Sequence, residues 1–324
     1  MIRFNLPMDK KMKKSMNKGY PMGDLVVKSN DLINASYNLG VVEQRLLLLC
    51  IIAARKKKAE LSPSDVFYIH ASEYIQQFNV DRSVAYRALA EGIKGIYDSE
   101  IKLTSPNSKK RINIRWCWKA EYDEDNATVG IAFTEDVIPL ISALEQRFTS
   151  YDIDQIAKLT SKYAIRLYEL IISWRLTNKT PIYELDDFRN KLGLGVTEYK
   201  TMSNFNTNVL NIAIQQINKF TDIKVKVNKH KKGVKISGFS FEITQRKTKQ
   251  QSNLSQDNTD KFYKLTDSQI NMFGNQLSRL PELSNLAVEG ESYEALAAKI
   301  KEMLREPEQQ RQFLPNLRNL GFKP

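Results

Sequence analysis

The stretch from residue 203 to residue 220 carries side chains suited to reading DNA bases. On a helical wheel of about 100° per residue, one side is apolar and holds Phe205, Val209, Ile212, Ala213, Ile217 and Phe220. The opposite arc has no acidic residue and holds Asn204, Thr207, Asn208, Asn211 and Gln215, with Ser203 at its start and Lys200 if the helix begins early. Amides can pair bidentately with adenine edges, and small side chains permit close approach to a groove. We predict a recognition helix here, although an ordinary solvated face would also be polar.

A lysine-rich hairpin follows this helix. Residues 223–227 and 234–243 are expected to pair as strands across a tip at residues 228–233. The lysines are Lys224, Lys226, Lys229, Lys231, Lys232 and Lys235. A wing of this composition neutralises phosphates and positions the helix without reading sequence. We expect Lys229, Lys231 and Lys232 to contact DNA.

The first half of the chain has a weaker version of the same pattern. Arg82, Arg87 and Lys94 are predicted on the exposed arc of a helix at residues 83–97, with Glu91 among them. The hairpin expected after that helix carries Lys109, Lys110, Arg111 and Arg115. These residues suit contacts with the DNA backbone more than with bases.

The elements that must position these residues occur in one order, twice. The first set is helix 41–58, strand 67–69, helix 73–78 with Ser72 as N-cap, helix 83–97 and strands 101–104, 111–120 and 128–133. The second set is helix 161–176, an extended piece at 181–183, helix 186–192, helix 203–220 and the lysine hairpin. This is the order of a winged helix-turn-helix. The sequence therefore predicts an α+β fold of two tandem winged-helix domains with a small helical C-terminal extension.

Composition shifts suggest the domain limits. We expect a basic disordered arm at 1–23, a first winged helix at 24–142 and a second at 143–246. The polar run 247–260 is typical of a linker, and short helices are expected at 267–279, 292–304 and 308–320 within an extension spanning 261–324. Helix 41–58 is apolar nearly all round, which indicates a core helix or a dimer interface, with the core favoured.

The charge favours a polyanionic partner. The formal net charge is +12 and the pI about 9.4, and all of the excess lies before residue 259, because the later segment is neutral. Nucleic acid is the first candidate and an anionic membrane surface the second. No secretory signal is visible, and the longest apolar run, 46–54, is too short to span a bilayer. Cys50 and Cys117 are predicted to be buried free thiols in the reducing cytoplasm.

Catalytic patterns are absent from the sequence. The two histidines, His70 and His230, are far apart, no metal-ligand spacing occurs and no glycine-rich phosphate loop is present. The paired histidines of metal-dependent nicking enzymes are missing, so the tyrosines that could serve as nucleophiles are interpreted as structural: Tyr151, Tyr163 and Tyr168. We expect no enzyme activity, no metal and no cofactor.

Three runs resemble the iteron-binding plasmid replication initiators, the Rep initiator superfamily. They are NDLINASYNLGVVEQRLLLLCI at 30–51, LTSKYAIRLYELIISW at 159–174 and FNTNVLNIAIQQIN at 205–218. The resemblance covers roughly residues 25–245. In this chain Asn206, Thr207 and Asn208 occupy a stretch that often holds more Arg or Lys in the family.

The resemblance implies two winged helices, the second reading tandem iterons in double-stranded DNA. It also implies a monomer that opens an AT-rich origin, a dimer that restrains replication through the first domain, and the host initiator and replicative helicase as partners. Two rivals stay open. One is a winged-helix transcriptional regulator without initiator activity, and the other is an origin-nicking or primase enzyme.

Overall fold

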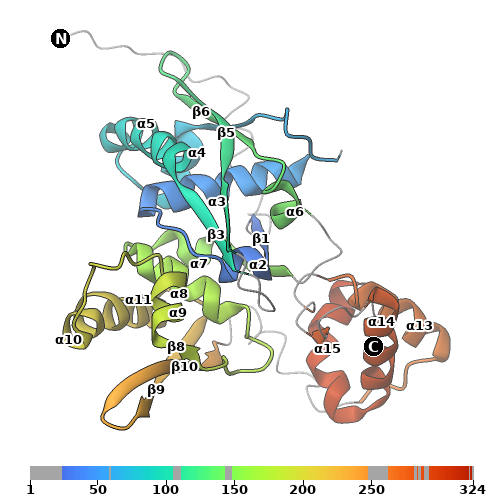
Figure 1. Cartoon of the computed structure of the whole chain (residues 1–324). Helices are drawn as coiled ribbons and strands as arrows, with labels where there is room; N and C mark the ends of the chain where they lie inside the picture. Colours follow the sequence, from blue (N-terminus) through green and yellow to red (C-terminus); the bar gives the residue numbers. More distant parts are fainter. Residues whose placement is uncertain are drawn as a thin grey trace.

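The computed structural model describes residues 24–57, 60–104, 111–142, 148–246, 262–280, 283, 286–287, 292–320 and 322. The expected arm at 1–23 and the linker at 247–260 lie outside the described residues, as do Lys109 and Lys110. Figure 1 shows two units that mix helices and strands, and a separate helical unit in red.

The first unit has the predicted winged-helix order with additions at both ends. Its elements are β1 (Leu25–Ser29), α2 (Asn30–Asn34), α3 (Val41–Lys56), β2 (Phe67–His70), α4 (Ala71–Phe78), α5 (Arg82–Asp98), β3 (Glu100–Thr104), β4 (Arg111–Arg115), β5 (Cys117–Asp123), β6 (Thr128–Phe133) and α6 (Ile138–Ser142). Helix α3 is buried along most of its length, so its apolar surface forms core.

Two details of this unit differ from the prediction. The expected strand 111–120 is two strands, because β4 pairs with β3 while β5 pairs with β6, on either side of the fully buried Trp116. The N-cap of α4 is His70 and not Ser72. Its Nδ1 accepts from the Ser72 backbone N–H at 3.0 Å, while the Glu73 carboxylate accepts from the His70 N–H.

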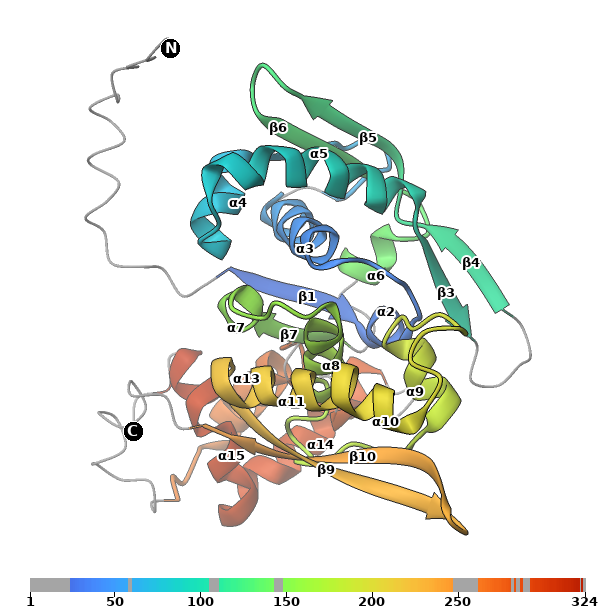
Figure 2. The same cartoon turned by 90° about the vertical axis from the view of Figure 1, so that its left-hand side faces the viewer.

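The second unit repeats the topology of the first. Its elements are β7 (Phe148–Asp152), α7 (Asp154–Ala157), α8 (Lys162–Ile172), β8 (Tyr183–Glu184), α9 (Leu185–Lys191), α10 (Met202–Phe205), the π-helical turn η1 (Asn206–Leu210), α11 (Asn211–Phe220), β9 (Ile223–Lys232) and β10 (Lys235–Gln245). The sheet order β8-β10-β9 corresponds to β2-β6-β5 in the first unit. The prediction of two winged-helix domains is confirmed (Figure 2).

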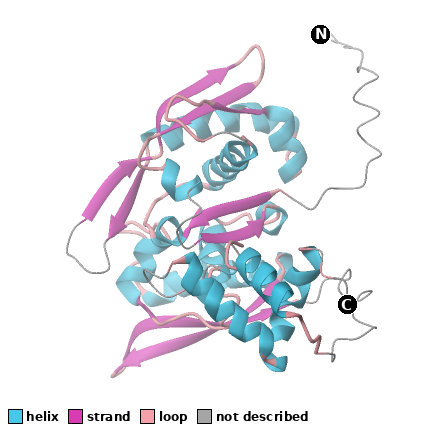
Figure 3. Cartoon of the chain, turned by 90° about the vertical axis from the view of Figure 1, so that its right-hand side faces the viewer, coloured by secondary structure: helices cyan, strands magenta, loops and turns pink. Residues whose placement is uncertain are grey.

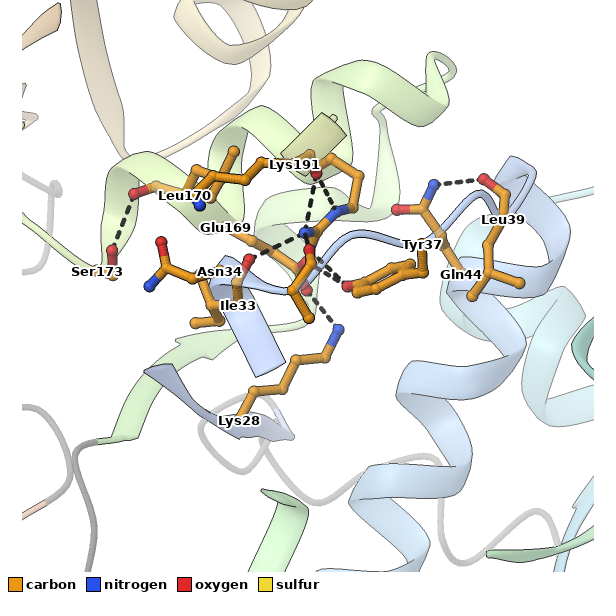
Figure 4. A network of polar contacts seen from close by, with 12 residues as sticks. Lys28, Ile33, Asn34, Tyr37, Leu39, Gln44, Glu169, Leu170, Ser173 and Lys191 are labelled. Atoms are coloured by element: carbon orange, nitrogen blue, oxygen red, sulfur yellow. Dashed lines mark hydrogen bonds and ion pairs between the residues drawn. The ribbon is translucent and has the colours of Figure 1, made fainter. Parts of the chain in front are cut away.

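A shared strand pair and a buried ionic cluster join the two units. Strand β1 pairs antiparallel with β7 over five residues. Beside it, Glu169 accepts from Lys28 and from Arg166, each at 2.7 Å (Figure 4). Arg166 Nη2 also donates to the carbonyl oxygens of Ile33 and Ala35. This cluster ties the chain that precedes α3 to helix α8.

The charges in this cluster shift the pKa values of their neighbours. Burial by itself would raise the pKa of Glu169, but the attraction of Lys28 and Arg166 outweighs it and holds that pKa at about 2. Burial lowers the pKa of Lys28 more than its ion pair with Glu169 raises it. The carboxylate of Glu169 is therefore ionised and balances two buried cations.

The C-terminal unit consists of helices, as predicted. They are α13 (Asp267–Leu277), α14 (Tyr293–Arg305) and α15 (Pro307–Asn319). They pack around their own apolar cluster, which includes Phe273, Ile300 and Phe313. Figure 3 shows that the described part of this unit is helical, whereas the other two units contain both helices and strands. Among the described residues, no helix has both the length and the apolar character needed to cross a membrane.

Candidate nucleic-acid interface

The predicted recognition helix is formed by α10, η1 and α11 in one uninterrupted run. It begins at the N-cap Thr201, whose hydroxyl accepts from the Asn204 backbone N–H. Lys200 precedes this cap, so it lies outside the helix and not on its arc as the early start would require. Phe205 anchors the helix by packing edge-on against Phe188 of α9, with ring centroids 6.2 Å apart. The Arg189 guanidinium lies over the Phe205 ring at 5.3 Å.

The middle of the helix contains a π turn that the sequence did not reveal. The Asn211 N–H bonds to the Asn206 carbonyl, five residues back, which adds one residue to that turn. Everything beyond it is turned back by about 100° relative to an α-helix. As a result Leu210 is 1% exposed and Ile212 is 37% exposed. The wheel of a regular α-helix predicts Ile212 on the buried side, and this prediction is wrong.

The polar residues predicted to face DNA lie on the solvent side of this helix. All of them are exposed: Ser203, Asn204, Thr207, Asn208 and Asn211. The Asn208 Nδ2 donates to the Asn204 carbonyl at 3.1 Å. Since a carboxamide has two N–H groups, its second N–H and its Oδ1 can still form a bidentate pair with a base.

Two amides fix this helix relative to its neighbours. Asn218 Oδ1 accepts from the Val225 N–H at 2.6 Å, and its Nδ2 donates to the Val225 carbonyl at 2.9 Å. Gln216 Oε1 accepts from the backbone N–H groups of Thr160 and Ser161, at the start of α8. The Gln216 Nε2 donates to the Thr160 hydroxyl, so both amides use their oxygen and their nitrogen, and the helix, the wing and α8 hold one arrangement.

The wing is longer than predicted. Residues 228–232 belong to β9, and the turn is made by Gly233, at φ 64°, and the exposed Val234. The tip expected at 228–233 is therefore wrong. His230 lies within the hairpin, where its Nε2 is 2.8 Å from the Ser240 hydroxyl.

The wing lysines divide between two faces. Side chains alternate along a strand, so Lys229 and Lys231 share the face of the buried Val225, against which α11 packs. Lys224, Lys226 and Lys232 project from the other face. There Lys226 lies 3.6 Å from Glu242, and Asn228 and then Lys226 lower the pKa of that carboxyl. Lys229 and Lys231 are thus the exposed wing cations on the side of the recognition helix.

In the first unit, helix α5 presents a mixed surface. Arg82, Arg87 and Lys94 are exposed together with Glu91, and the guanidinium of Arg82 lies 5.8 Å from the Tyr86 ring. The N-cap is Asp81, whose carboxylate accepts from the Ser83 N–H at 2.7 Å. The three basic side chains reach solvent as predicted, but the exposed carboxylate of Glu91 lies among them.

The basic hairpin of the first unit is not its wing. Arg111 is exposed on β4, which forms a separate two-stranded sheet with β3. The topological equivalent of the lysine wing is β5–β6, which carries the acidic residues Glu121, Asp123, Glu124 and Asp125. The acidic turn is visible in the sequence. Its place as the wing is not, because the inserted hairpin β3–β4 precedes it along the chain.

The side chains considered for catalysis are held inside the fold. Tyr151 donates to Glu169 and Tyr168 to Asp222, and burial raises the pKa of both phenols well above the ordinary value. Cys50 and Cys117 are buried free thiols, as predicted, and burial raises the pKa of Cys117 to about 12. Within the described ranges, no group of three metal-ligating side chains comes together.

Comparison with known proteins places this architecture in a family. The family model described as "Initiator Replication protein, WH1" matches residues 25–172, and "Initiator Rep protein, WH2" matches residues 184–243. Together they span nearly two thirds of the chain.

Individual relatives agree with this match. The PI protein of Escherichia coli is 28% identical over 246 residues, which cover 66% of this chain and 80% of that protein. An uncharacterized 27.6 kDa protein of Escherichia coli is 24% identical over 213 residues, 62% of this chain and 87% of its own length. The crystal structure of Pi initiator protein in complex with iteron DNA has 24% identity and a TM-score of 0.59, covering 71% of this chain and 100% of that one, so the fold is shared. The WH1 match includes the first winged helix and continues through α8, and the WH2 match includes α9, the recognition helix and the lysine wing, so the protein belongs to the family of initiator replication proteins.

Proposed function

We propose that the protein is a plasmid replication initiator that binds tandem iterons in origin DNA through WH2. One observation carries this: the exposed face of α10–η1–α11 is rich in amides and free of acidic residues, and Lys229 and Lys231 flank it on the wing. The helix supplies groups for base edges, and the wing supplies charge for phosphates. Pi initiator protein, solved with iteron DNA, has the same fold.

In this proposal WH1 binds the phosphate backbone of the same duplex. Figures 1 and 2 place α5 and α11 along the same side of the molecule, so one duplex can meet both helices. Arg82, Arg87, Lys94 and Arg111 are the exposed cations of WH1 that would contact phosphates. Lys200 would add charge at the start of the recognition helix, and Lys232 would add charge at the tip of the wing. The limits 24–142 and 143–246 for the two domains are part of the same proposal.

The mechanism is binding and not catalysis. Several copies on neighbouring iterons would bend the origin and help melt an adjacent AT-rich segment in the cytoplasm, where the host initiator and the replicative helicase would be recruited. A dimer of the same chain would repress its own gene. No step of this mechanism requires a nucleophile, a metal or a cofactor from the protein.

Footprinting the full-length protein on the DNA that flanks its own gene tests the central claim. We expect protection of regularly spaced repeats, with a Kd of about 10⁻⁸ to 10⁻¹¹ M that weakens steeply with salt. Uniform protection of all DNA would refute it.

Two further assays separate the rivals. A plasmid that carries only the flanking repeats and the AT-rich segment should be maintained in cells only when this protein is supplied. Site-specific binding without maintenance would identify a transcriptional regulator. Nicks or primers formed by the pure protein with supercoiled origin DNA and magnesium would instead identify an enzyme.

A further inference from the structure

The π turn exchanges one apolar residue of the recognition helix for another at the core. Without it, Ile212 would lie two turns after Phe205 on the buried side, as an α-helical wheel requires. With it, Leu210 fills the core and Ile212 projects into solvent. Leucine and isoleucine have nearly the same apolar surface, so core packing gains little from preferring Leu210 over Ile212.

One polar atom in the turn also lacks a partner. The Asn206 Oδ1 is buried and has no hydrogen-bond partner among the described residues, which is unfavourable in a folded protein. Single π turns inside α-helices are frequent at functional sites. An arrangement that exposes an isoleucine and strands an amide oxygen is therefore better explained by what the exposed face contacts.

The neighbours of Ile212 define that contact. Gln215 lies three residues after Ile212 within α11, so the two are neighbours on the helix surface, and the exposed Asn208 lies just before Ile212 in the π turn. Asn208 and Gln215 are both exposed amides that can pair with base edges. In the major groove the one apolar feature of the four bases is the C5 methyl group of thymine, and apolar side chains contact it.

We propose that Ile212 is a specificity-determining residue that contacts a thymine methyl group in the major groove, and that the π turn η1 places it there. The inference rests on the proposed function, because it requires this helix to read bases. The amides beside Ile212 would pair with neighbouring base edges, so the preferred site contains a thymine at one fixed position relative to the bases that they read.

Deoxyuridine tests this contact directly, since it differs from thymidine only by the missing methyl. The probe is the duplex that the full-length protein selects from a pool of random sequences, with each thymine replaced in turn. At one position the wild-type Kd should rise by about three- to tenfold, the range expected for one or two buried methyl-sized groups. Ile212→Ala should bind the unmodified site more weakly by a similar factor and be insensitive to deoxyuridine at that position.

Ile182→Ala is the matched control. Ile182 is an equally apolar side chain that is 53% exposed just before β8 and is not part of the recognition helix, so this variant should keep the wild-type response at every thymine. Thermal unfolding followed by circular dichroism should show that both variants fold. If Ile212→Ala responds to deoxyuridine as the wild type does at all positions, the proposal is overturned while the proposed function stands. If the wild-type protein selects no sequence, the proposed function itself fails.

Discussion

WH1 and WH2 share one topology and differ in charge at every surface that a winged helix offers to DNA. The recognition helix of WH2 has no acidic residue on its exposed face, and its wing is rich in lysine. In WH1, Glu91 lies among the exposed cations of α5, and the corresponding wing β5–β6 is acidic. The same backbone order therefore carries two different surfaces, and we infer that only the surface of WH2 reads bases, because function resides in the surface and not in the fold.

The inserted hairpin β3–β4 offers the proposed DNA contact of WH1. It carries Arg111 on a sheet of its own, separate from the acidic wing. In WH2 the charged wing and the reading helix are locked together by Asn218. We infer that WH2 specifies the site and that WH1 adds affinity, and the following predictions test this division.

The largest effect should come from removing the carboxylate of the buried ionic cluster. Replacing Glu169 by Ala leaves Lys28 and Arg166 buried without their carboxylate, which should lower the free energy of unfolding by about 3–5 kcal/mol. Chemical denaturation measures it. Asp24→Ala, which removes the exposed ion pair to Lys56, should lower it by less than about 1 kcal/mol. Equal losses in the two variants would show that the buried cluster stabilises the fold no more than an exposed ion pair does.

The same carboxylate should make the free energy of unfolding sensitive to acid. Because the folded-state pKa of Glu169, about 2, lies below the ordinary value near 4.3, its ionised form stabilises the fold above that ordinary value. This stabilisation should be lost as the pH falls from about 4 toward 2. Glu169→Gln should flatten the pH dependence of the unfolding free energy in that window. A wild-type slope in the variant would contradict the assignment.

Asn208→Ala should weaken binding to the selected site by about 1–3 kcal/mol and relax discrimination against single base changes. Asn204→Ala should behave alike. The measurement is the ratio of Kd values on specific and random duplexes. Arg87→Ala in WH1 is the matched comparison, and it should weaken both duplexes equally. If Asn208→Ala also weakens both equally, the division between the domains is wrong.

The smallest effect should distinguish the two faces of the WH2 wing. Lys231→Ala should weaken binding to all DNA and reduce the slope of log Kd against log salt by about one. Lys226→Ala, on the opposite face and beside Glu242, should change the slope much less. Titrations at several salt concentrations measure both. Identical slopes for the two variants would show that the wing does not approach DNA with the face predicted.

Much of the molecule follows from local sequence. The alternation of apolar residues gave both sets of winged-helix elements, and the charge distribution separated the basic body from the neutral extension. The exposed positions of Asn204, Asn208 and Arg87 also followed, because they depend on helical periodicity close to a clear apolar anchor. Helix ends were less predictable, as the His70 cap of α4 illustrates.

Local sequence alone thus determined the fold class, the repeat of the domains and most of the polar face of the recognition helix. Tertiary structure decided which hairpin of WH1 is the wing, since strand pairing joins distant segments. It also brought together Lys28 and Glu169, which are 141 residues apart. Finally, it placed Leu210 in the core and Ile212 at the surface through a π turn, which local sequence does not reveal because the two side chains are equally apolar.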